Sequence, residues 1–512
     1  MLLETPGSIL EDYMDDFFKK IGVLLIIIIK EEKKMSLINA LQQNSLIENS
    51  KGGLYHHTSF NANLDLYSGI SRFNRDQEIV RAFSNAYSEN RVLALANLLF
   101  ILDIREGKGE RRIFKVIFKY LCKQNPEDAR LILSYIGSLG RYDYILEGLK
   151  TNIEDDVINL IKITINSDLE SEHPSLLAKW LPSHRTHGVN SQIAKYLINK
   201  LGMCEKEYRQ TLSKLRSKIN IVEKNLTNQT YDNIKFDEVP TKAMLKYTRT
   251  FDREIHDRFV EYKHFLVRGE AKVNTAGLFC YEVVKNVLAR KTDAEVLEAM
   301  WKSQKAIDTG NNNVLVVADT SGSMTCYGGL PYAASVGLAL YTAEHNKGVF
   351  KDKFITFSSR PIFQEVKGAS ISDRIHNVKS IVDNTDIDKV FELILKSMKD
   401  SNSTQEDLPS HIIIISDMEF DDGVYSKGGT NFQGWKKAFA EHGYTLPKIV
   451  FWNVAGRTNG LPVTKNDKDV VMVSGFSTNL LESIFKVEEF NPVEQMLAAL
   501  KKYIELVEKD SF

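Results

Sequence analysis

The stretch that most constrains the fold is 313–324, which reads Asn-Val-Leu-Val-Val-Ala-Asp-Thr-Ser-Gly-Ser-Met. Its apolar run at 314–318 is rich in β-branched residues, which is typical of a buried strand in a parallel sheet. An Asp-x-Ser-x-Ser loop at 319–323 follows, and a helical pattern begins at Pro331, a residue accepted at helix starts. Open α/β sheets bind ligands at the carboxyl ends of their strands, so this loop is a candidate site.

The oxygen side chains of the loop suit a hard divalent cation such as Mg²⁺ or Mn²⁺, which prefers oxygen ligands and keeps several waters. One carboxylate and two hydroxyls supply only part of that shell, so other loops must contribute. Two candidates stand at suitable places, one in a polar stretch at 383–388 and one at the end of a second buried strand, 411–417. The expected metal ligands are Asp319, Ser321, Ser323, Thr385 and Asp417.

The order and separation of these five residues resemble the metal-ion-dependent adhesion site of von Willebrand factor A domains. The resemblance implies that an acidic residue of a partner completes the metal shell. The chemistry of the ligands explains this, because neutral hydroxyls leave residual positive charge on the cation. An open coordination position then attracts a carboxylate from a protein or another ligand.

Strands and helices alternate through the C-terminal part of the chain, which predicts a doubly wound parallel sheet. A polar linker at 308–313 leads into this domain, which we assign to 307–512. The expected strands are 313–318, 353–357, 411–416, 448–453 and 470–473. The expected helices are 331–346, 387–399, 432–442 and 479–486, followed by a final amphipathic helix at 491–509.

The N-terminal part has a helical pattern from Leu64 onward. Apolar residues recur at i, i+3 and i+4 within 78–87, 92–102, 113–122 and 129–136. Short connections between amphipathic helices indicate antiparallel neighbours, and a long series of them builds an α-solenoid. We therefore predict a helical-repeat domain, an α-solenoid, at 35–306, in which 35–63 form a short helix and a loop.

The most distinctive segment of this half is 102–114, Leu-Asp-Ile-Arg-Glu-Gly-Lys-Gly-Glu-Arg-Arg-Ile-Phe. It resembles the Arg-Asp-x-Lys-Gly-Glu-Arg turn of TROVE proteins, the family of the Ro autoantigen. That family joins a ring of HEAT-like repeats to a von Willebrand factor A domain and binds structured and misfolded RNA on the ring. A closer resemblance is to a phage and bacterial domain-of-unknown-function family of the same layout, with landmarks at 176–183, 207–209, 221–223 and 239–240.

Two groups of basic residues are candidates for the RNA contacts that this resemblance implies. Spacings of three and four place the first group on one stripe of a helix, and the second group recurs on the next basic helix. Phosphate contacts need such stripes, and their affinity depends steeply on salt. The alternative is a solvated helix face. The candidate RNA-binding residues are Lys108, Arg111, Arg112, Lys115, Lys119, Arg209, Lys214, Arg216 and Lys218.

Composition limits the partners and the compartment. The net charge is −1, so no global charge favours nucleic acid or acidic membranes, and any basic surface is local. The four cysteines form no Cys-x-x-Cys pair, which argues against a zinc site and fits a reducing cytoplasm. The apolar run 23–29 is far shorter than the roughly 20 residues that span a bilayer, so we expect no membrane partner.

Residues 1–34 are expected to be a translated leader. Lys30-Glu31-Glu32 can be encoded by AAG-GAG-GAA, which contains a bacterial ribosome-binding sequence just upstream of the Met35 codon. We therefore expect Met35 to be the natural start and the source to be bacterial or a bacterial virus, with the protein in the host cytoplasm in the second case. The alternative is a genuine disordered or amphipathic tail.

The sequence is compatible with three functions. The first is a non-enzymatic, Mg²⁺-dependent binding protein whose helical half binds RNA, as a TROVE-like ribonucleoprotein component does. The second is a protein-interaction scaffold without RNA binding. The third is a metal-dependent phosphoryl hydrolase, which needs a second metal or a general base near Asp319. Asp386, Asp421 and Asp422 are the candidates for that role, but no familiar hydrolase motif surrounds them, so we expect no enzyme.

Overall fold

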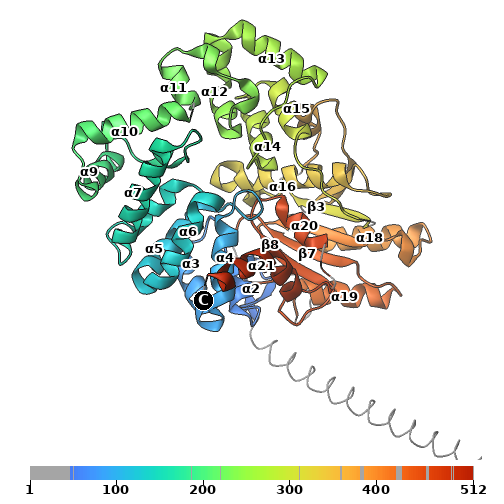
Figure 1. Ribbon diagram of the computed structural model, residues 1–512. Coiled ribbons are helices and arrows are strands. Elements are labelled where there is room, and N and C mark those ends of the chain that lie inside the picture. The colour runs from blue at the N-terminus through green and yellow to red at the C-terminus, as the bar shows by residue number, and fades with distance from the viewer. Residues whose placement is uncertain are drawn as a thin grey trace, which may run out of the picture.

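The computed structural model describes residues 46–49, 51–185, 187–219, 221–310, 312–357, 360–380, 386–421, 429–456, 460–485, 487 and 489–510. The expected leader, 1–34, lies outside the described residues, as does the start of the predicted helical domain, 35–45. Helices dominate the described chain as far as 302, and a large sheet begins at 314 (Figure 1). None of the described helices is both long enough and apolar enough to cross a membrane.

The helices of the first half are amphipathic, and their apolar faces pack into a core. In α5 (Arg111–Gln124), for example, Ile113, Ile117 and Leu121 are buried, whereas Lys119 is exposed. Connections of a few residues join many of the neighbouring helices, as in antiparallel helix pairs. The other helices are α2 (Ala62–Gly69), α3 (Asp76–Glu89), α4 (Arg91–Leu102), α6 (Pro126–Leu139), α7 (Glu154–Glu170), α8 (Leu177–Trp180), α9 (Val189–Leu201), α10 (Glu205–Lys218), α11 (Val222–Thr227), α12 (Thr241–Glu254), α13 (His256–Arg268), α14 (Cys280–Ala289) and α15 (Ala294–Lys302).

These helices follow an arc through space. The arc runs from α3 through α5, α7 and α10 to α12 and α13, and it returns through α14 to the sheet half (Figure 1). The prediction of a helical region followed by a parallel-sheet domain is confirmed at this level of description.

Among the residues that the structure describes, a six-stranded sheet forms the second half. The pairs β3–β4, β3–β6, β6–β7 and β7–β8 are parallel, whereas the edge strand β5 pairs antiparallel with β4. All five predicted strands are present, and β5 is an addition in which two of the four residues are half-buried and two are exposed. In spatial order β5-β4-β3-β6-β7-β8, the strands are Ile362–Glu365, Lys353–Phe357, Val314–Asp319, His411–Ser416, Lys448–Asn453 and Val470–Ser474.

The strand order places helices on both faces of the sheet. The chain leaves β3 toward β4 through α16 (Cys326–His345), and it leaves β6 in the opposite direction, toward β7, through α19 (Asn431–Glu441). Because such crossovers are right-handed, these two helices lie on opposite faces. On the α19 side, Trp435 stacks on Phe391 of α18 (Asp388–Asp400) with ring centres 4.0 Å apart. The remaining helices are α17 (Ile371–His376), α20 (Asn479–Phe485) and α21 (Pro492–Lys509).

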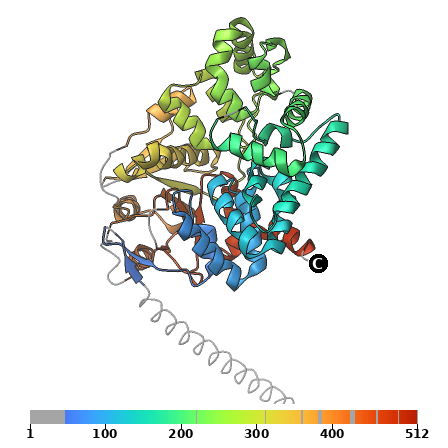
Figure 2. The same ribbon diagram turned by 90° about the vertical axis from the view of Figure 1, so that its left-hand side faces the viewer.

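The two halves share one continuous hydrophobic core. Helix α14 packs along α16 so closely that a Cβ on Gly337 would lie 3.0 Å from Cys280. The last helix, α21, returns to the first half and lies against α2 and α4 (Figures 1 and 2). There the Tyr503 hydroxyl donates a hydrogen bond to Asp103 at 3.0 Å. The C-terminal helix therefore ties the sheet half to the first helices of the chain.

The expectation of a short helix and a loop over 35–63 is wrong for part of its described residues. Strand β1 (Leu46–Glu48) pairs antiparallel with β2 (Leu54–His56), so this segment is a hairpin. Its stability depends on a distant part of the chain, because Gly52 forms a β-bridge with Asp421 in the sheet half. Local sequence composition does not reveal a pairing partner at that separation.

Candidate functional site

The carboxyl ends of β3 and β6 lie next to each other in the middle of the sheet, and the connections leave them in opposite directions. Ligands of open α/β sheets bind in such a crevice. Asp319 is the last residue of β3, and Asp417 directly follows β6. Both side chains are fully buried. The structure therefore brings these two predicted metal ligands to the same edge.

Hydrogen bonds fix the Asp319 carboxylate between the two strand ends. Its Oδ1 accepts from the backbone N–H of Ser321 at 2.9 Å, and its Oδ2 accepts from the Ser416 hydroxyl at 2.6 Å. The hydroxyl oxygens of Ser321 and Ser323 are 3.0 Å apart. Ser321 is buried and Ser323 is half-buried, so the hydroxyl pair leads from the carboxylate toward solvent. The three predicted ligands of this loop form one cluster.

The two buried carboxylates interact unfavourably. Burial, and to a smaller extent the charge of Asp417, raises the pKa of Asp319 to about 7, although hydrogen bonds from Ser416 and Ser321 act in the other direction. A nearby positive charge favours the ionised form of a carboxyl group and so offsets this repulsion. The edge of the sheet is therefore suited to a cation.

The loop after Asp417 has an unusual backbone. Met418 is buried and has a φ of +63°, in the left-handed region that side chains other than Asn and Asp rarely adopt. Its N–H donates to the Ser416 hydroxyl oxygen at 3.1 Å. The N–H of Glu419 donates to Oδ1 of Asp417, also at 3.1 Å. These bonds turn the chain tightly around the Asp417 carboxylate.

Thr385, the remaining predicted ligand, lies outside the described residues, and so does Asp422. Asp386 accepts a hydrogen bond from the backbone N–H of Lys389 at 3.3 Å, close to the start of α18. Asp421 forms a β-bridge with the N-terminal hairpin. Across the described ranges, no three or more His, Cys, Asp or Glu side chains are grouped so that they could hold a metal ion. A cation at the strand ends would therefore depend on hydroxyls and water as well as on carboxylates.

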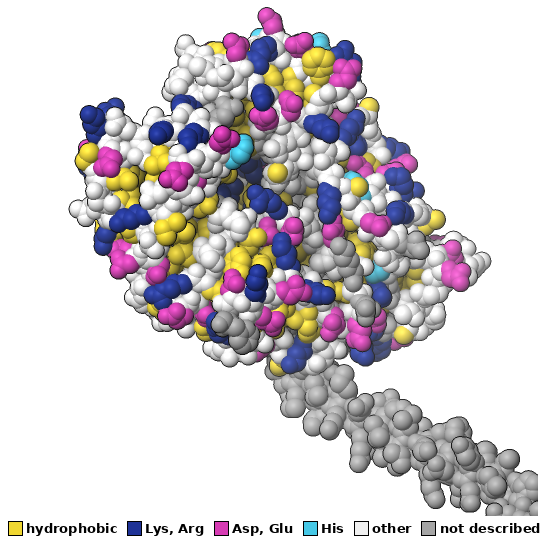
Figure 3. Space-filling view, in the orientation of Figure 1, with side chains coloured by type: hydrophobic (Ala, Val, Ile, Leu, Met, Phe, Trp, Pro, Cys, Tyr) yellow, Lys and Arg dark blue, Asp and Glu magenta, His cyan; other side chains and the backbone are white. Residues whose placement is uncertain are grey.

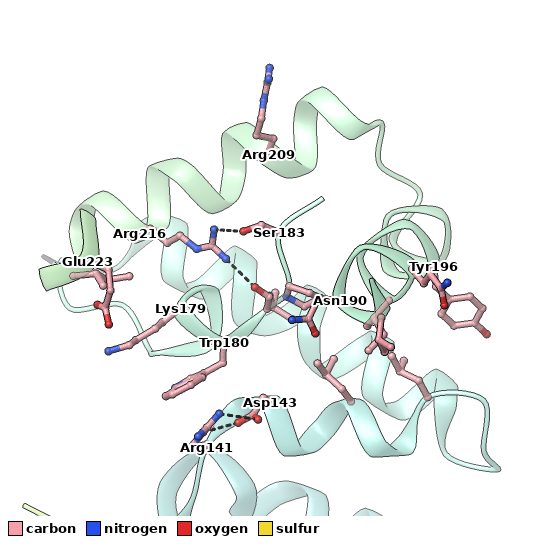
Figure 4. A pocket seen from close by; sticks show the side chains of 18 of the residues that line it. Arg141, Asp143, Lys179, Trp180, Ser183, Asn190, Tyr196, Arg209, Arg216 and Glu223 are labelled. Atoms are coloured by element: carbon pink, nitrogen blue, oxygen red, sulfur yellow. Dashed lines mark hydrogen bonds and ion pairs between the residues drawn. The ribbon is translucent and has the colours of Figure 1, made fainter. Parts of the chain in front are cut away.

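A second candidate site is a groove in the helical half, formed by α5, the 3-10 turn Tyr142–Gly148 and the segment from α8 to α11 (Figure 4). Its volume is about 1210 Å³. Among its described lining side chains, eight are Lys or Arg and three are Asp or Glu. The basic ones are Lys115, Lys119, Arg141, Lys150, Lys179, Arg209, Arg216 and Lys224.

Trp180 supplies an aromatic ring to this groove. The guanidinium carbon of Arg141 lies 3.7 Å from the centre of that ring, and an ion pair of 2.8 Å with Asp143 holds the guanidinium in place. Figure 4 shows this pair directly beside Trp180. The surrounding motif, 176–183, is interpreted from the sequence only as a sign of kinship, although it places Lys179 directly next to this aromatic side chain.

Lys108 does not lie on a basic surface stripe, so its predicted position among exposed basic residues is wrong. It precedes the first residue of α5 and is 2% exposed. Its ammonium group donates to the backbone carbonyl of Tyr67 and, at 2.9 Å, to the hydroxyl of Ser474. Burial lowers the pKa of Lys108 to about 7. The helical spacing argument fails here because the turn before α5 folds inward.

Arg112 and Lys218 have other partners than the predicted phosphates. Arg112 donates to the backbone carbonyls of Arg72 at 2.9 Å and Asn74 at 2.6 Å. Lys218 donates to the carbonyl of Leu169, in the last turn of α7, at 2.8 Å. Each side chain thus donates hydrogen bonds to backbone carbonyl oxygens of another segment. These bonds give both residues a structural role.

Arg216 likewise ties two segments together. It donates at 2.8 Å to the backbone carbonyls of Ala178 and Leu181, and at the same distance to the Ser183 hydroxyl. Its burial lowers the pKa of the guanidinium. Figure 4 shows Arg216 directed toward Ser183. This residue shapes the wall of the groove and has few donors left for a ligand.

The other predicted basic residues are accessible to different degrees. Arg111, Lys119, Arg209 and Lys214 are exposed, whereas Lys115 is half-buried beside Glu147 at 3.1 Å. Three of them, Lys115, Lys119 and Arg209, line the groove. The two basic helices that the sequence indicated, α5 and α10, therefore face the same groove.

The visible face of the whole molecule is mixed in charge. In Figure 3, Lys and Arg side chains alternate with Asp and Glu over most of the surface shown. This agrees with the net charge of −1, whereas the lining of the groove is mostly basic among its charged residues.

Family models match parts of both halves of the chain. The family described as domain of unknown function DUF2828 matches residues 152–316, and the family described as domain of unknown function DUF7788 matches residues 313–510. The two matches meet at the start of β3.

A relative and a solved structure extend over both halves. The "Uncharacterized protein L728" of Acanthamoeba polyphaga mimivirus is 28% identical over 499 residues, which cover 88% of this chain and 87% of that protein. The crystal structure of the Ro (RSR) protein of Deinococcus radiodurans aligns with a TM-score of 0.47 and 13% identity, covering 87% of this chain and 99% of that one.

Proposed function

We propose that this chain is a non-enzymatic RNA-binding protein that holds RNA in the groove of its helical half. The observation that carries the proposal is the charge of the groove, where eight Lys and Arg side chains face three Asp and Glu side chains. The chain as a whole has a net charge of −1, so the basic excess of the groove is local. A phosphate backbone is the ligand that such a local concentration of cations attracts.

The size and lining of the groove support a polymer as the ligand. Its volume of about 1210 Å³ exceeds the roughly 300–1,000 Å³ of small-molecule pockets. Stacking of a base on an aromatic ring such as Trp180 contributes about 1–3 kcal/mol. The resemblance of 102–114 to the TROVE turn favours RNA over DNA as the ligand. The same resemblance favours HEAT-like repeats as the architecture of the helical arc.

The cations that would bind phosphates can be told apart from those with acidic partners inside the groove. Arg141 pairs with Asp143, and both Lys115 and Lys119 pair with Glu147. Two of the three acidic lining residues therefore already have basic partners, and phosphate binding falls to the basic side chains outside these pairs. These are Lys150, Lys179, Arg209 and Lys224.

The test is RNA affinity at two salt concentrations for the wild type and for a triple variant, Lys150→Gln, Lys179→Gln and Arg209→Gln. We expect weaker binding in the variant, because three phosphate contacts are lost. The slope of log affinity against log salt should flatten by about two units on a single strand, since each contact adds about 0.7.

The matched control is Lys396→Gln, Lys399→Gln and Lys468→Gln, which removes the same charge at exposed positions of the sheet half. It should bind RNA as the wild type does. The proposal fails if the wild type binds RNA no better than a neutral control protein, or if both triple variants lose affinity equally.

We propose, as a second function, that the ends of β3 and β6 bind a divalent cation. The cluster of oxygen atoms at these strand ends supports this proposal. The hydroxyl oxygens of Ser321 and Ser323 are 3.0 Å apart. Two adjacent ligands of octahedral Mg²⁺, with bonds of about 2.0–2.1 Å at right angles, lie about 2.9 Å apart. The buried carboxylates of Asp319 and Asp417 supply the negative charge that the cation needs.

With Thr385 as a further ligand, this set corresponds to the metal-ion-dependent adhesion site that the von Willebrand factor A resemblance implies. We propose Mg²⁺ or Mn²⁺ as the ion. A carboxylate of a partner protein would take the remaining coordination position, which would make the sheet half a protein-interaction module alongside the RNA-binding half.

The cation proposal is tested by thermal unfolding with and without Mg²⁺ or Mn²⁺. A cation that binds only the folded protein stabilises it by about 2.7 kcal/mol at a hundred times its dissociation constant. Asp319→Ala should abolish this increment, whereas Asp386→Ala, which removes a carboxylate at the start of α18, should retain it. An increment that survives in Asp319→Ala contradicts the assignment.

A further inference from the structure

The N-terminal hairpin holds the main chain of the loop that follows β6. Nδ2 of Asn49 donates to the carbonyl of Phe420 at 2.8 Å, and the N–H of Phe420 donates to the Tyr55 hydroxyl at 3.0 Å. One loop residue is therefore bound at both its N–H and its C=O. Lys51 adds a hydrogen bond to the carbonyl of Glu419 at 3.2 Å.

The hairpin approaches the loop closely enough to require a glycine. A Cβ on Gly53 would lie 2.6 Å from the carbonyl oxygen of Phe420. Next to it, Gly52 forms the β-bridge with Asp421. Oδ1 of Asn49 accepts from the N–H of Gly53 at 2.8 Å, which orients the amide so that its Nδ2 reaches the loop. The contact is therefore specific to this hairpin geometry.

The loop that the hairpin holds is strained directly beside a proposed cation ligand. Met418 has a positive φ, and residues in that region persist only where the surrounding structure determines their conformation. Some of this restraint comes from Ser416 and Asp417 within the loop. The rest comes from the hairpin, where Tyr55 is 3% exposed and burial raises the pKa of its hydroxyl, which stays neutral.

We propose that the hairpin is a clamp that positions Asp417 for cation binding, with Tyr55 and Asn49 as positioning residues. This inference rests on the proposed cation function. It means that the site is assembled from the first described residues of the chain as well as from the sheet. Without the clamp, the loop relaxes away from the left-handed conformation at Met418, and the Asp417 carboxylate leaves the position beside Asp319.

The test compares Tyr55→Phe and Gly53→Ala with the wild type in two measurements. The first is amide hydrogen exchange of 418–421 in the cation-free protein, and the second is Mn²⁺ affinity by titration calorimetry. The clamp predicts faster exchange in both variants. It also predicts an affinity lowered by about fivefold in Tyr55→Phe, the equivalent of one ordinary hydrogen bond.

Two controls separate this effect from general destabilisation. Tyr208→Phe also removes a buried tyrosine hydrogen bond, 2.9 Å long, to the carbonyl of Pro182 in the helical half. Gly69→Ala adds a Cβ at an ordinary 3.6 Å from its nearest neighbour. Both controls should leave the exchange of the loop and the Mn²⁺ affinity unchanged.

The outcomes distinguish the clamp from the cation site. Unchanged exchange in Tyr55→Phe overturns the clamp, and so does faster exchange with unchanged Mn²⁺ affinity. A wild type that binds no Mn²⁺ overturns the cation function and the positioning role that depends on it. Faster exchange together with weaker affinity in the hairpin variants alone supports the inference.

Discussion

The ammonium group of Lys108 lies 2.9 Å from the hydroxyl of Ser474, the last residue of β8. Lys108 comes from the turn between α4 and α5, so this hydrogen bond joins the two halves of the chain. The same ammonium donates to the carbonyl of Tyr67 and lies 4.7 Å from the centre of the Tyr67 ring. A cation buried at this junction makes the stability of the fold depend on pH.

Lys108→Met should remove that dependence. Burial lowers the pKa of Lys108 from its ordinary value of 10.5 to about 7, so the unfolded state binds more protons than the folded state between these values. The free energy of unfolding of the wild type should therefore rise from pH 7 toward pH 10, by at most about 1.4 kcal/mol per pH unit. Urea unfolding at pH 7, 8 and 9 measures the difference between wild type and variant.

The Met variant is a fair comparison because it keeps an unbranched side chain at this position. The carbonyl of Tyr67 also stays paired, since the Ser474 hydroxyl donates to it at 3.0 Å. If the difference in unfolding free energy stays constant over this pH range, Lys108 is charged in both states and the prediction is wrong.

The inward fold of the turn that contains Lys108 could not be predicted from the local sequence. The periodic pattern correctly placed a helix over 113–122, and the helix extends from Arg111 to Gln124. The same pattern cannot show that the turn before it folds inward, because the partner, Ser474, is far away in the sequence. A basic residue near a helix start therefore gave a wrong prediction of a surface position.

The candidate cation site was predictable because its parts are local. Asp319 and Asp417 each follow a continuous apolar run, and parallel strands place such positions at one edge of a sheet. The groove and the hairpin were not predictable in this way. Trp180 and Arg141 come from different segments whose packing decides that they meet, and the partner of Tyr55 lies in the sheet half.

Asp319→Asn should remove a second pH dependence, in the cation-free protein. Burial and the charge of Asp417 raise the pKa of Asp319 from 3.8 to about 7, so the folded state binds more protons than the unfolded state in this window. The stability that this group contributes is fully present below about pH 4 and is lost as the pH rises through 7. Unfolding in EDTA at pH 5 and pH 8 should show this loss in the wild type only.

The Asn side chain can still accept from Ser321 and can donate to Ser416, so the fold of the loop should survive the change. At pH 8, Mg²⁺ should restore the stability of the wild type but not that of the variant. A wild type and a variant with the same pH profile in EDTA would show that Asp319 is ionised at all these pH values.

Arg216→Gln should destabilise the protein, whereas Arg209→Gln should not. The Arg216 guanidinium donates at 2.8 Å to the carbonyls of Ala178 and Leu181, and leaving a buried acceptor unpaired costs about 1–3 kcal/mol. Arg209 is exposed, and changes at such positions stay within about 0.5 kcal/mol. Both substitutions remove one positive charge, so urea unfolding compares packing alone. Equal stabilities would contradict the structural role of Arg216.

Tyr503→Phe should be more destabilising than Lys502→Gln, although both residues of α21 contact the same turn. The Tyr503 hydroxyl donates at 3.0 Å to Asp103, and both side chains are 2% exposed. Losing one hydrogen bond to a buried charged group costs about 1.5–3 kcal/mol. Lys502 pairs with Glu106 at 2.7 Å and lies 3.7 Å from the same Asp103 carboxylate, but the Lys502 side chain is itself 47% exposed, and pairs of such solvent-exposed groups contribute about 0–1 kcal/mol.

The comparison also tests whether the C-terminal helix holds the first helices in place. Oδ1 of Asp103 accepts from the N–H groups of Arg105 at 2.8 Å and Glu106 at 3.1 Å, which fixes the start of the turn that ends at α5. If Tyr503 supports this carboxylate, combining Tyr503→Phe with Asp103→Asn should cost less than the sum of the two single changes, since contacting residues couple by about 0.5–3 kcal/mol. Strictly additive free energies of unfolding would show that the Tyr503–Asp103 contact does not couple α21 to this turn.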